Sequence, residues 1–477
     1  MKLRAFIFPA LAALLLLSCC APEPVPPRYV ILFISDGWGY EHLEAVKNYT
    51  GEDPVYADWD SWAVSTWDTD TRRANGGVGY DPEKAWSEFD YVARAATDSA
   101  SAATAMYTGF KADAGNLGTG PGDLMRLACI REYAEYFGLA SGAVTSVPVS
   151  HATPAAWYAH NDDRGNGYAV FDEGVWGVPG STGSGEGYGG GCGGSCCPPA
   201  VLIGAGHPGW NSDYVSPAQL ERLAADCRDY GVWRLVERVA GSPDGGARLL
   251  EAAENPRTER LFGLFGGEDG CFDWALADGS GASAENPTLA ECTEAALAVL
   301  DRDPEGFVLL VEGGAVDWAS HAGDMDRMIG EEREFDAAVR AVVDWVEDPS
   351  TPASWDDTLV IVTGDHECGY LTAGPGIRGV PLGEVSPRTL GLERPYDPSG
   401  LRAGWEDGDA DGVVDSGEAV YWAWNSHGHT NSLIPLYARG EWAGLFEGYI
   451  AAEDPVRGPY LDDTAIFLVM LGVLMED

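Results

Sequence analysis

Lysine is nearly absent from this chain of 477 residues. Only four of its 29 basic residues are lysine, whereas 75 residues are acidic, and the formal net charge at pH 7 is −46. A surface this negative repels polyanions and anionic lipid headgroups. Nucleic acid is therefore excluded as an expected partner, and so is direct adsorption to an anionic membrane. A salty habitat and an ordinary secreted protein are both compatible with such a surface.

Long apolar runs are missing as well, apart from residues 5–17. That run is shorter than the roughly 20 residues that a membrane-spanning helix needs. It follows Lys2 and Arg4, and this order of charged and then apolar residues is typical of a secretory signal. We therefore expect an exported protein with a soluble mature body.

The end of this signal resembles that of a bacterial lipoprotein, because it reads Leu-Leu-Ser-Cys up to Cys19. The resemblance implies a signal peptide of residues 1–18, a lipid on Cys19 and a Pro-rich tether of residues 19–27. The protein would then be periplasmic or attached to the cell surface, in contact with a membrane only through that anchor. An ordinary signal peptide with a later cleavage site is the alternative.

Neither internal repeats nor a disordered composition is found. Hydrophobic residues make up 45% of the chain, and its 17 tryptophans exclude a disordered protein. No period typical of a solenoid or a propeller occurs. We predict a single domain over residues 28–477, because the segments that carry chemistry lie on both sides of a Gly- and Cys-rich stretch, 179–198. That stretch is expected to be a surface insertion.

The cysteines favour disulfides. Eight of the ten lie beyond the signal region, and an even number in an exported protein favours disulfide pairing, although the connectivity stays open. Cys192, Cys196 and Cys197 lie in the stretch 179–198. A metal clip is conceivable there, but no histidine is nearby, so disulfides that staple a loop are favoured.

Three apolar runs end abruptly in acid. YVILFIS precedes Asp36, FVLLV precedes Glu312, and LVIVTG precedes Asp365. Runs without alternation are typical of strands buried on both faces, which predicts an α/β fold with a central, mostly parallel sheet flanked by helices. Ligands bind beyond the carboxyl ends of such strands. Three carboxylates at one edge repel one another unless a cation lies between them, so a metal cluster is predicted.

The segment TDSASAATAMYTG, residues 97–109, carries the candidate nucleophile. Its small residues predict a closely packed helix with Asp98 or Ser99 at the amino end. A hydroxyl there benefits from the helix dipole and from exposed N–H groups, which also favour an incoming anion. An N-cap is the alternative function of such a residue. Beside a metal cluster, we favour Ser99 as a nucleophile.

Thr153 and Arg164 belong to the segment SHATPAAWYAHNDDR. Thr153 is predicted to cap a helix that starts at Pro154, because proline is favoured at the first helical position. Arg164 follows about three turns later and could be an ordinary surface residue. A guanidinium is also the best-shaped side chain for binding phosphate or sulfate.

The chain has only eight histidines, and several of them accompany acids. Asp317 and His321 are spaced i, i+4, which places them on one face of a helix. His366 directly follows Asp365 at a strand end, and His427 and His429 precede another apolar run. Imidazole and carboxylate are ligands that zinc prefers. Together these residues predict a site with several metal ions.

These segments resemble the alkaline phosphatase family, from about residue 28 to the C-terminus apart from insertions. The resemblance implies that Ser99 is the attacking nucleophile and that Arg164 clamps the phosphate. It implies these metal ligands: Asp36, Asp365 and His366 for one zinc; Asp317, His321 and His429 for a second zinc; Asp36, Thr153 and Glu312 for a magnesium-type ion. His151 and Trp318 stand near this third site, where some members carry Asp and Lys and others the same His and Trp. This departure bears on the metal preference of the third site and on the rate of phosphate release.

The implied activity is that of an alkaline phosphatase (EC 3.1.3.1). A metal would lower the pKa of the Ser99 hydroxyl, which would attack phosphorus in line and form a phosphoserine before inorganic phosphate leaves. Because charge rather than leaving-group recognition stabilises the transition state, many small phosphomonoesters are expected as substrates. The resemblance also implies a homodimer.

Residues 407–418, DGDADGVVDSGE, fit the calcium-loop pattern D-x-D-x-D-G-x5-E. The oxygens would come from Asp407, Asp409, Asp411, Asp415 and Glu418 and from the backbone of Val413. An acidic surface loop is the alternative. Bound calcium would rigidify the approach to His429, eleven residues after the loop.

Two other functions compete with the phosphatase. One is another hydrolase of the same superfamily, such as a phosphodiesterase, a sulfatase or a phosphoglycerate mutase. The set of Asp36, Thr153 and Glu312 favours a phosphomonoesterase over a diesterase, and the sulfatase motif is absent. The other is a secreted calcium-dependent binding protein on an inactive phosphatase-like fold. Every expected ligand is present, which disfavours the inactive protein.

Overall fold

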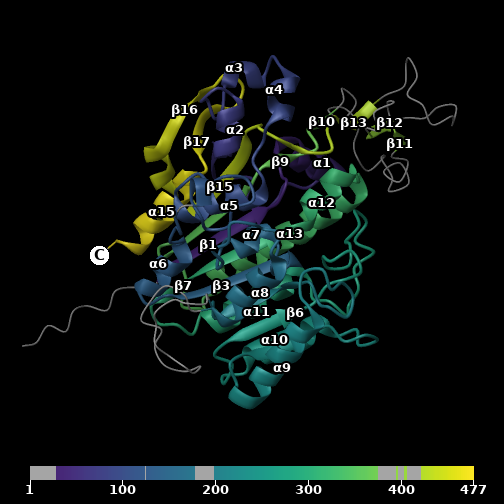
Figure 1. Ribbon diagram of the computed structural model, residues 1–477, viewed down its shortest axis with the longest axis vertical. Helices are drawn as coiled ribbons and strands as arrows, with labels where there is room; N and C mark the ends of the chain where they lie inside the picture. Colours follow the sequence, from purple (N-terminus) through teal and green to yellow (C-terminus); the bar gives the residue numbers. More distant parts are fainter. Residues whose placement is uncertain are drawn as a thin grey trace, which may run out of the picture.

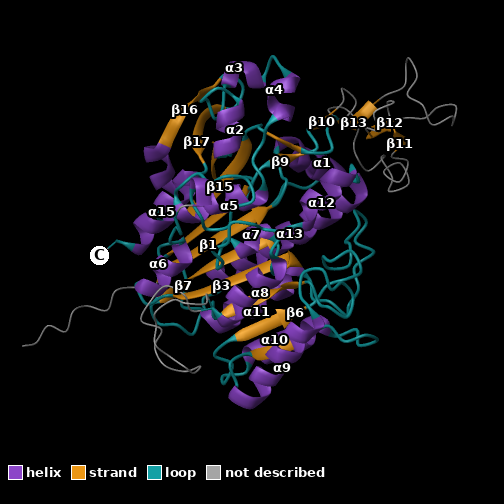
Figure 2. Cartoon of the chain, viewed as in Figure 1, coloured by secondary structure: helices purple, strands orange, loops and turns teal. Residues whose placement is uncertain are grey.

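The computed structural model describes residues 28–123, 125–177, 198–373, 394–395, 402–405 and 420–476. A broad sheet crosses the molecule, with helices on both of its faces (Figures 1 and 2). The sheet has 11 strands and is mostly parallel. The α/β fold that the sequence predicts is therefore confirmed.

The strands of this sheet are connected by crossovers rather than by hairpins alone. In spatial order they are β16 (Ile450–Asp454), β17 (Gly458–Asp462), β2 (Asp60–Ser65), β15 (Ile434–Gly440), β8 (Thr358–Gly364), β1 (Arg28–Ser35), β7 (Gly306–Gly313), β3 (Ala140–Pro148), β4 (Val201–Ala205), β6 (Leu261–Leu264) and β5 (Arg234–Glu237). The pairs from β8 across to β5 are parallel. β15 is antiparallel to both β8 and β2, and β16 is antiparallel to β17.

Helices of ordinary length cover the sheet. They are α1 (Tyr40–Thr50), α5 (Ser99–Thr108), α6 (Ile130–Tyr136), α8 (Gly167–Trp176), α9 (Pro217–Tyr230), α10 (Gly245–Glu254), α11 (Leu289–Leu300), α12 (Ala315–Ala322), α13 (Met325–Glu347) and α15 (Thr464–Leu474). Shorter pieces are α2 (Thr69–Ala74), α3 (Pro82–Ala85), α4 (Phe89–Arg94) and α7 (Ala152–Ala155). The ends of α9 follow from the sequence, since Ser216 forms a capping box before Pro217 and Gly231 ends the helix in the left-handed region.

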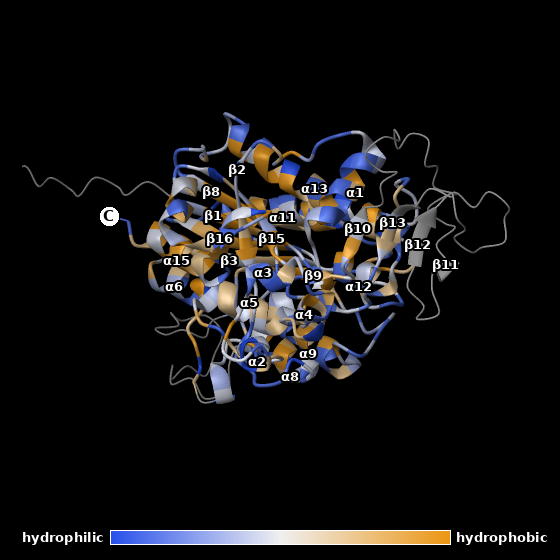
Figure 3. Cartoon of the chain, turned by 90° about the horizontal axis from the view of Figure 1, so that it is seen from above, coloured by the Kyte–Doolittle hydropathy of each residue, from blue (hydrophilic) through white to orange (hydrophobic). Residues whose placement is uncertain are grey.

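The middle strand β1 separates two apolar cores. Val30, Leu32 and Ile34 pack toward α5, α6 and α15, whereas Ile31 and Phe33 pack toward α11 and α13. In Figure 3, α1 and α13 carry both hydrophilic and hydrophobic residues, as expected of helices with one buried face. Burial on both faces explains why the strand reads as a continuous apolar run.

The three strand-end acids lie at one edge because their strands are neighbours. β1 pairs with β7 so that Ile34 lies opposite Glu312, and with β8 so that Ser35 lies opposite Gly364. Asp36 and Asp365 are the residues that follow Ser35 and Gly364. The parallel register thus brings the three carboxylates to the same rim of the sheet, as the sequence predicts.

Two small sheets lie beside the main one. β9 (Glu367–Cys368) pairs with β14 (His429–Thr430), which places His429 opposite Cys368. β10 (Leu371–Ala373), β13 (Val420–Trp424), β12 (Arg402–Trp405) and β11 (Arg394–Pro395) form the other. The two-residue ladder joins the segment after β8 to a segment some 60 positions later.

Several predicted features lie outside the described residues: the signal peptide 1–18, the tether 19–27, nearly all of the insertion 179–198 and the calcium loop 407–418. No helix within the described ranges is long and apolar enough to cross a membrane. Five described cysteines, Cys129, Cys227, Cys271, Cys292 and Cys368, are free. The expected disulfides are therefore not formed by these five, and four of them are instead buried as small side chains.

Candidate active site

Ser99 begins helix α5 at the rim where the strand-end acids meet. Asp98 is the N-cap and accepts a hydrogen bond from the Ser101 N–H at 3.0 Å. All residues of α5 are buried, because its alanines and serines let neighbouring elements approach closely. The Ser99 hydroxyl lies 3.2 Å from Nε2 of His366. The nucleophile predicted from the sequence therefore reaches a predicted metal ligand.

The first cluster consists of Asp36, Asp365 and His366, all fully buried. Nε2 of His366 lies 3.1 Å from Oδ2 of Asp365 and 3.6 Å from Oδ1 of Asp36. Ligand atoms around one zinc ion are about 3–4 Å apart, since each bond is near 2 Å. The Gly37 N–H donates to the other oxygen of Asp365 at 3.0 Å and so orients this carboxylate.

The second cluster joins Asp317 and His321 of α12 to His429 of β14. Asp317 lies 3.4 Å from Nε2 of His321 and 3.3 Å from Nε2 of His429. Nδ1 of His321 donates to the His427 carbonyl at 2.6 Å, and Nδ1 of His429 donates to a second carbonyl, of Thr97, at 2.9 Å. These bonds leave both Nε2 atoms free to bind a metal.

Cys368 also belongs to the second cluster, and sequence reasoning missed it. Its sulfur lies within ligand-forming range of Asp317, His321 and His429, and its thiol is hydrogen bonded to Asp317. Its only signal in the sequence was its position two residues after His366. The β9–β14 pairing makes the contact, because Cys368 lies opposite His429.

The third cluster contains Asp36, Glu312 and His151. The Thr153 hydroxyl donates to Oδ2 of Asp36 at 3.4 Å. The prediction that Thr153 caps a helix starting at Pro154 is wrong. His151 is the N-cap of α7, and the Thr153 hydroxyl is turned to the acid instead. Asp36 therefore contributes to two clusters, as the resemblance implies.

A second threonine at the third cluster was not predicted. Thr145 of β3 donates a hydrogen bond to Oε2 of Glu312. The two residues lie opposite each other where β3 pairs with β7. No local sequence pattern reveals such a contact, because it depends on which strands are neighbours.

Arg164 is fixed beside Ser99 by an ion pair. Its guanidinium donates to Asp98 at 2.8 Å and lies 3.3 Å from Nε2 of His151. Burial alone would raise the pKa of Asp98, but Arg164 and the hydrogen bonds of the cap hold it well below its usual range. The His151 ring in turn lies 5.4 Å from that of Trp318, at 76°. Arg164, His151 and Trp318 thus form one contiguous wall.

The buried carboxylates at the rim of the sheet favour the binding of cations. Burial and the repulsion of neighbouring carboxylates raise the pKa of Asp36 well above its usual value. Burial likewise raises the pKa of Glu312 to about 8 and that of Asp365 to about 6. The orphaned oxygens, buried and without a hydrogen bond, are Asp36 Oδ1, Glu312 Oε1, Asp317 Oδ1 and Asp365 Oδ2. Metal ions fit these clusters in donor type and spacing.

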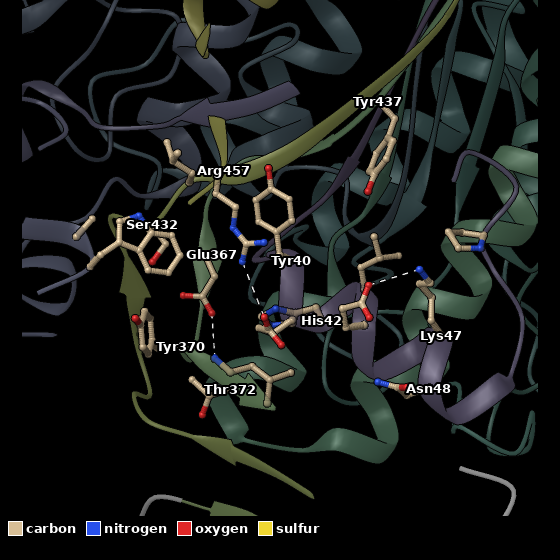
Figure 4. A pocket seen from close by; sticks show the side chains of 18 of the residues that line it. Tyr40, His42, Lys47, Asn48, Glu367, Tyr370, Thr372, Ser432, Tyr437 and Arg457 are labelled. Atoms are coloured by element: carbon tan, nitrogen blue, oxygen red, sulfur yellow. Dashed lines mark hydrogen bonds and ion pairs between the residues drawn. The ribbon is translucent and has the colours of Figure 1, made fainter. Parts of the chain in front are cut away.

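A separate cleft of about 1080 Å³ is lined in part by Glu367 and residues 370–372, in the segment that follows His366. In Figure 4, Glu367 points into it, and Arg457 lies against the ring of Tyr40, 3.7 Å from its centroid. The Leu371 N–H donates to Glu367 at 3.2 Å. Among the described residues that line this cleft, none is a member of the three metal clusters.

Curated proteins of similar sequence are phosphatases. Alkaline phosphatase 4 of Bacillus subtilis (strain 168) is 23% identical over 90% of this chain and 87% of the relative. Streptomycin-6-phosphate phosphatase of Streptomyces griseus is 29% identical over 94% of this chain and 91% of the relative.

Solved structures share the fold. A cold-active alkaline phosphatase from Shewanella sp. matches with a TM-score of 0.62 and 22% identity, covering 94% of this chain and all of the other. The alkaline phosphatase of the Antarctic bacterium TAB5 matches with a TM-score of 0.59 and 19% identity, covering 94% and 99%. Two variants of the TAB5 enzyme hold magnesium in their M3 site.

The family model described as alkaline phosphatase matches residues 27–174 and 244–456. These ranges contain Ser99, Arg164 and every member of the three metal clusters. They leave out residues 175–243, which include α9 and β5. On this match the chain belongs to the alkaline phosphatase family.

Proposed function

We propose that this family member hydrolyses phosphomonoesters through a phosphoserine on Ser99, with zinc at the first and second clusters and magnesium at the third. One observation carries the proposal. The Ser99 hydroxyl lies at the start of α5, 3.2 Å from His366, while Arg164 is held beside it by Asp98. A nucleophile, an anion clamp and a set of metal ligands therefore meet at one point.

Zinc at these clusters would lower the pKa of the Ser99 hydroxyl and of water, and would stabilise the oxygen of the leaving group. The donor sets suit this assignment, because the first two clusters combine imidazole with carboxylate. The third offers the oxygens of Asp36, Glu312 and Thr153, which suit magnesium, with an imidazole from His151 nearby.

The side chains of the protein position the substrate and take up the phosphoryl group. Arg164 presents a planar fork to two phosphate oxygens, and the N-terminus of α5 attracts the same anion. Oγ of Ser99 then forms a bond to phosphorus while the bond to the leaving oxygen breaks, and the serine proton ends on the leaving alcohol. Water next attacks the phosphoserine, which restores the hydroxyl and releases inorganic phosphate.

Wild-type protein should hydrolyse p-nitrophenyl phosphate faster than bis-p-nitrophenyl phosphate and lose both activities with a chelator. Ser99→Ala should lower kcat by at least about a hundredfold. Thr108→Val is the matched control, since it removes a buried hydroxyl at the other end of α5 that bonds to the Thr104 carbonyl rather than to Asp98 or His366. Faster hydrolysis of the diester would instead support a phosphodiesterase.

The phosphoserine can be located directly. Arg94 and Lys111 flank a tryptic peptide of residues 95–111 that contains Ser99. Enzyme quenched in acid during turnover should carry one phosphate on this peptide, assigned to Ser99 by mass spectrometry. A phosphate on another residue, or none in the presence of full activity, would contradict the mechanism.

The setting of the enzyme is proposed from the sequence. The charged and apolar start and the cysteine at position 19 support export with a lipid anchor, to the periplasm or the cell surface. The Asp-rich pattern of residues 407–418 supports a calcium ion as a further cofactor. Family membership supports a homodimer. Cell fractionation of a Cys19→Ser variant tests the anchor, and sedimentation of the purified enzyme tests the dimer.

A further inference from the structure

Aromatic rings lie next to Arg164, where His151 and Trp318 pack against each other. Ser99 itself is only 2% exposed, so a bound phosphate lies inside and the rest of the substrate must extend outward. His151 and Trp318 are half-buried. Trp318 directly follows Asp317, a residue of the second cluster. The His151 ring contacts Arg164, so a substrate whose phosphate is bound by Arg164 lies beside these rings.

Tyr214 extends this wall by a third ring. Its ring lies 6.4 Å from that of His151, at 68°. A Cβ on Gly270 would lie 3.1 Å from Cε2 of Tyr214 and 3.6 Å from Cη2 of Trp318, so the bare glycine fills the space between the two side chains. Burial and the charge of Asp213 raise the pKa of Tyr214, and the charge of Arg164 offsets only part of this rise. Tyr214 thus lies next to the ring of His151, which in turn contacts Arg164.

The chain around Tyr214 is tied to the active-site loops. The Ser150 hydroxyl donates to the Tyr214 carbonyl at 3.1 Å, one residue before His151. The Asn211 side chain donates to the Glu268 carbonyl at 3.2 Å, and the Tyr168 hydroxyl donates to the Ser212 carbonyl at 2.7 Å. The backbone that carries the Tyr214 ring is therefore held in place before substrate binds, which favours a contact that costs little ordering.

Tyr214 lies in residues 175–243, the part of the chain that the family model does not match. The other two rings of this wall, His151 and Trp318, lie within the matched ranges. We propose that Tyr214 determines leaving-group specificity by forming, with Trp318 and His151, an aromatic wall against which a ring-bearing leaving group packs.

The proposal rests on the proposed phosphomonoesterase activity and names its preferred substrate class, the aryl phosphates. The bond between phosphorus and the aryl oxygen breaks as the bond to Ser99 forms, and the phenol leaves with the serine proton. Rings packed edge to face, as His151 and Trp318 are, gain attraction beyond area burial. An aryl group that continues this arrangement gains the same attraction, and an alkyl group does not.

The test compares phenyl phosphate with ethyl phosphate. Tyr214→Ala should lower kcat/KM for phenyl phosphate by roughly two- to tenfold, the size of one aromatic contact, and change it less than twofold for ethyl phosphate. Tyr214→Phe keeps the ring and should keep the preference. Tyr136→Ala is the control, because this tyrosine is 83% exposed and outside the rim. It should change neither value.

If Tyr214→Ala lowers kcat/KM equally for both substrates, Tyr214 only supports the loop. If it lowers neither value, the leaving group does not contact Tyr214. Either result overturns the proposal. Calorimetric binding of phenylphosphonate and methylphosphonate separates it from the proposed function. If wild-type enzyme is inactive on both esters, the proposed hydrolytic function is wrong. The aromatic wall is still supported if wild type binds phenylphosphonate more tightly than methylphosphonate and Tyr214→Ala loses this binding preference. If wild type binds the two phosphonates with equal affinity, the proposed aromatic wall is wrong, and the proposed hydrolytic function is unaffected.

Discussion

Asp98 holds Arg164 and caps helix α5 with the two oxygens of one carboxylate. Oδ1 accepts the Ser101 N–H at 3.0 Å, and Oδ2 accepts from the Arg164 guanidinium at 2.8 Å. Arg164, the proposed phosphate clamp, and the helix that starts with Ser99 therefore share a single anchor. Their relative position is set before substrate binds.

Asp98→Asn should separate the two functions of this anchor. Asparagine is a good N-cap, so α5 stays intact, but the charge that holds Arg164 is lost. KM for p-nitrophenyl phosphate and the inhibition constant of inorganic phosphate should both rise by roughly three- to tenfold, because the guanidinium is no longer preorganised. Steady-state kinetics measure both values. Asp162→Asn, at an exposed position before Arg164, should change neither, and unchanged constants in Asp98→Asn would contradict the anchor.

Cys368 should help to retain the metal of the second cluster by orienting Asp317. Cys368→Ser keeps a donor and should keep the metal, whereas Cys368→Val keeps the bulk but loses the donor. We expect the valine variant to bind zinc about ten- to a hundredfold more weakly. Metal content after dialysis against a competing chelator measures this. Cys292→Ala, a buried cysteine in the core between α11 and its neighbours, controls for general loss of stability. Equal zinc retention in the serine and valine variants would rule out the role.

Thr145 should act on the third cluster through Glu312. Thr145→Val preserves shape and removes the hydroxyl that donates to Glu312. The magnesium concentration for half-maximal activation should rise roughly tenfold, the size of effect typical of residues that orient a ligand. Thr293→Val is the matched control, since this buried threonine of α11 bonds only to the Leu289 carbonyl among the contacts described. An unchanged magnesium dependence in Thr145→Val would show that Glu312 needs no such partner.

Glu331 should make the fold less stable at alkaline pH. Burial raises its pKa from 4.5 to about 8. A raised acid pKa means that stability is fully present below pH 4.5 and is lost as pH rises to about 8, because folding then buries a charge. Glu331→Gln keeps the acceptor for the Ala275 N–H at 2.9 Å and removes the titration. The free energy of unfolding, measured with urea near pH 5 and near pH 9, should fall between these two pH values in the wild type. In the variant this fall should be smaller by on the order of 1–3 kcal/mol. Glu254→Gln, exposed on α10, should follow the wild type.

Residues 407–418, which lie outside the described residues, are expected to bind calcium. Calcium added to zinc-replete enzyme should raise Tm by roughly 2–5 °C at a hundredfold excess over Kd. Asp409→Ala should abolish the shift, and Glu406→Ala, just outside the pattern, should keep it. If calcium leaves Tm of the wild type unchanged, residues 407–418 are an acidic loop without a bound ion.

The common location of the three strand-end acids could be predicted from the sequence. Apolar runs and their ends are visible locally, and parallel strands always place their carboxyl ends at the same edge of a sheet. It also placed Ser99 at the start of a helix. It did not place Thr153 correctly, because capping and bonding to Asp36 compete for one hydroxyl and only the tertiary structure decides. Thr145 and Cys368 depend on strand neighbours, β3 with β7 and β9 with β14, which no local pattern specifies.

Asp36 faces two ways, with Oδ1 toward His366 and Oδ2 toward Thr153. One carboxylate therefore enters the binding free energy of two ions, and their affinities are thermodynamically linked. A cation at the first cluster draws charge from the shared group and weakens the third, and by reciprocity the third weakens the first by the same factor. The occupancy of either site by a metal ion would then depend on whether the other site is already filled.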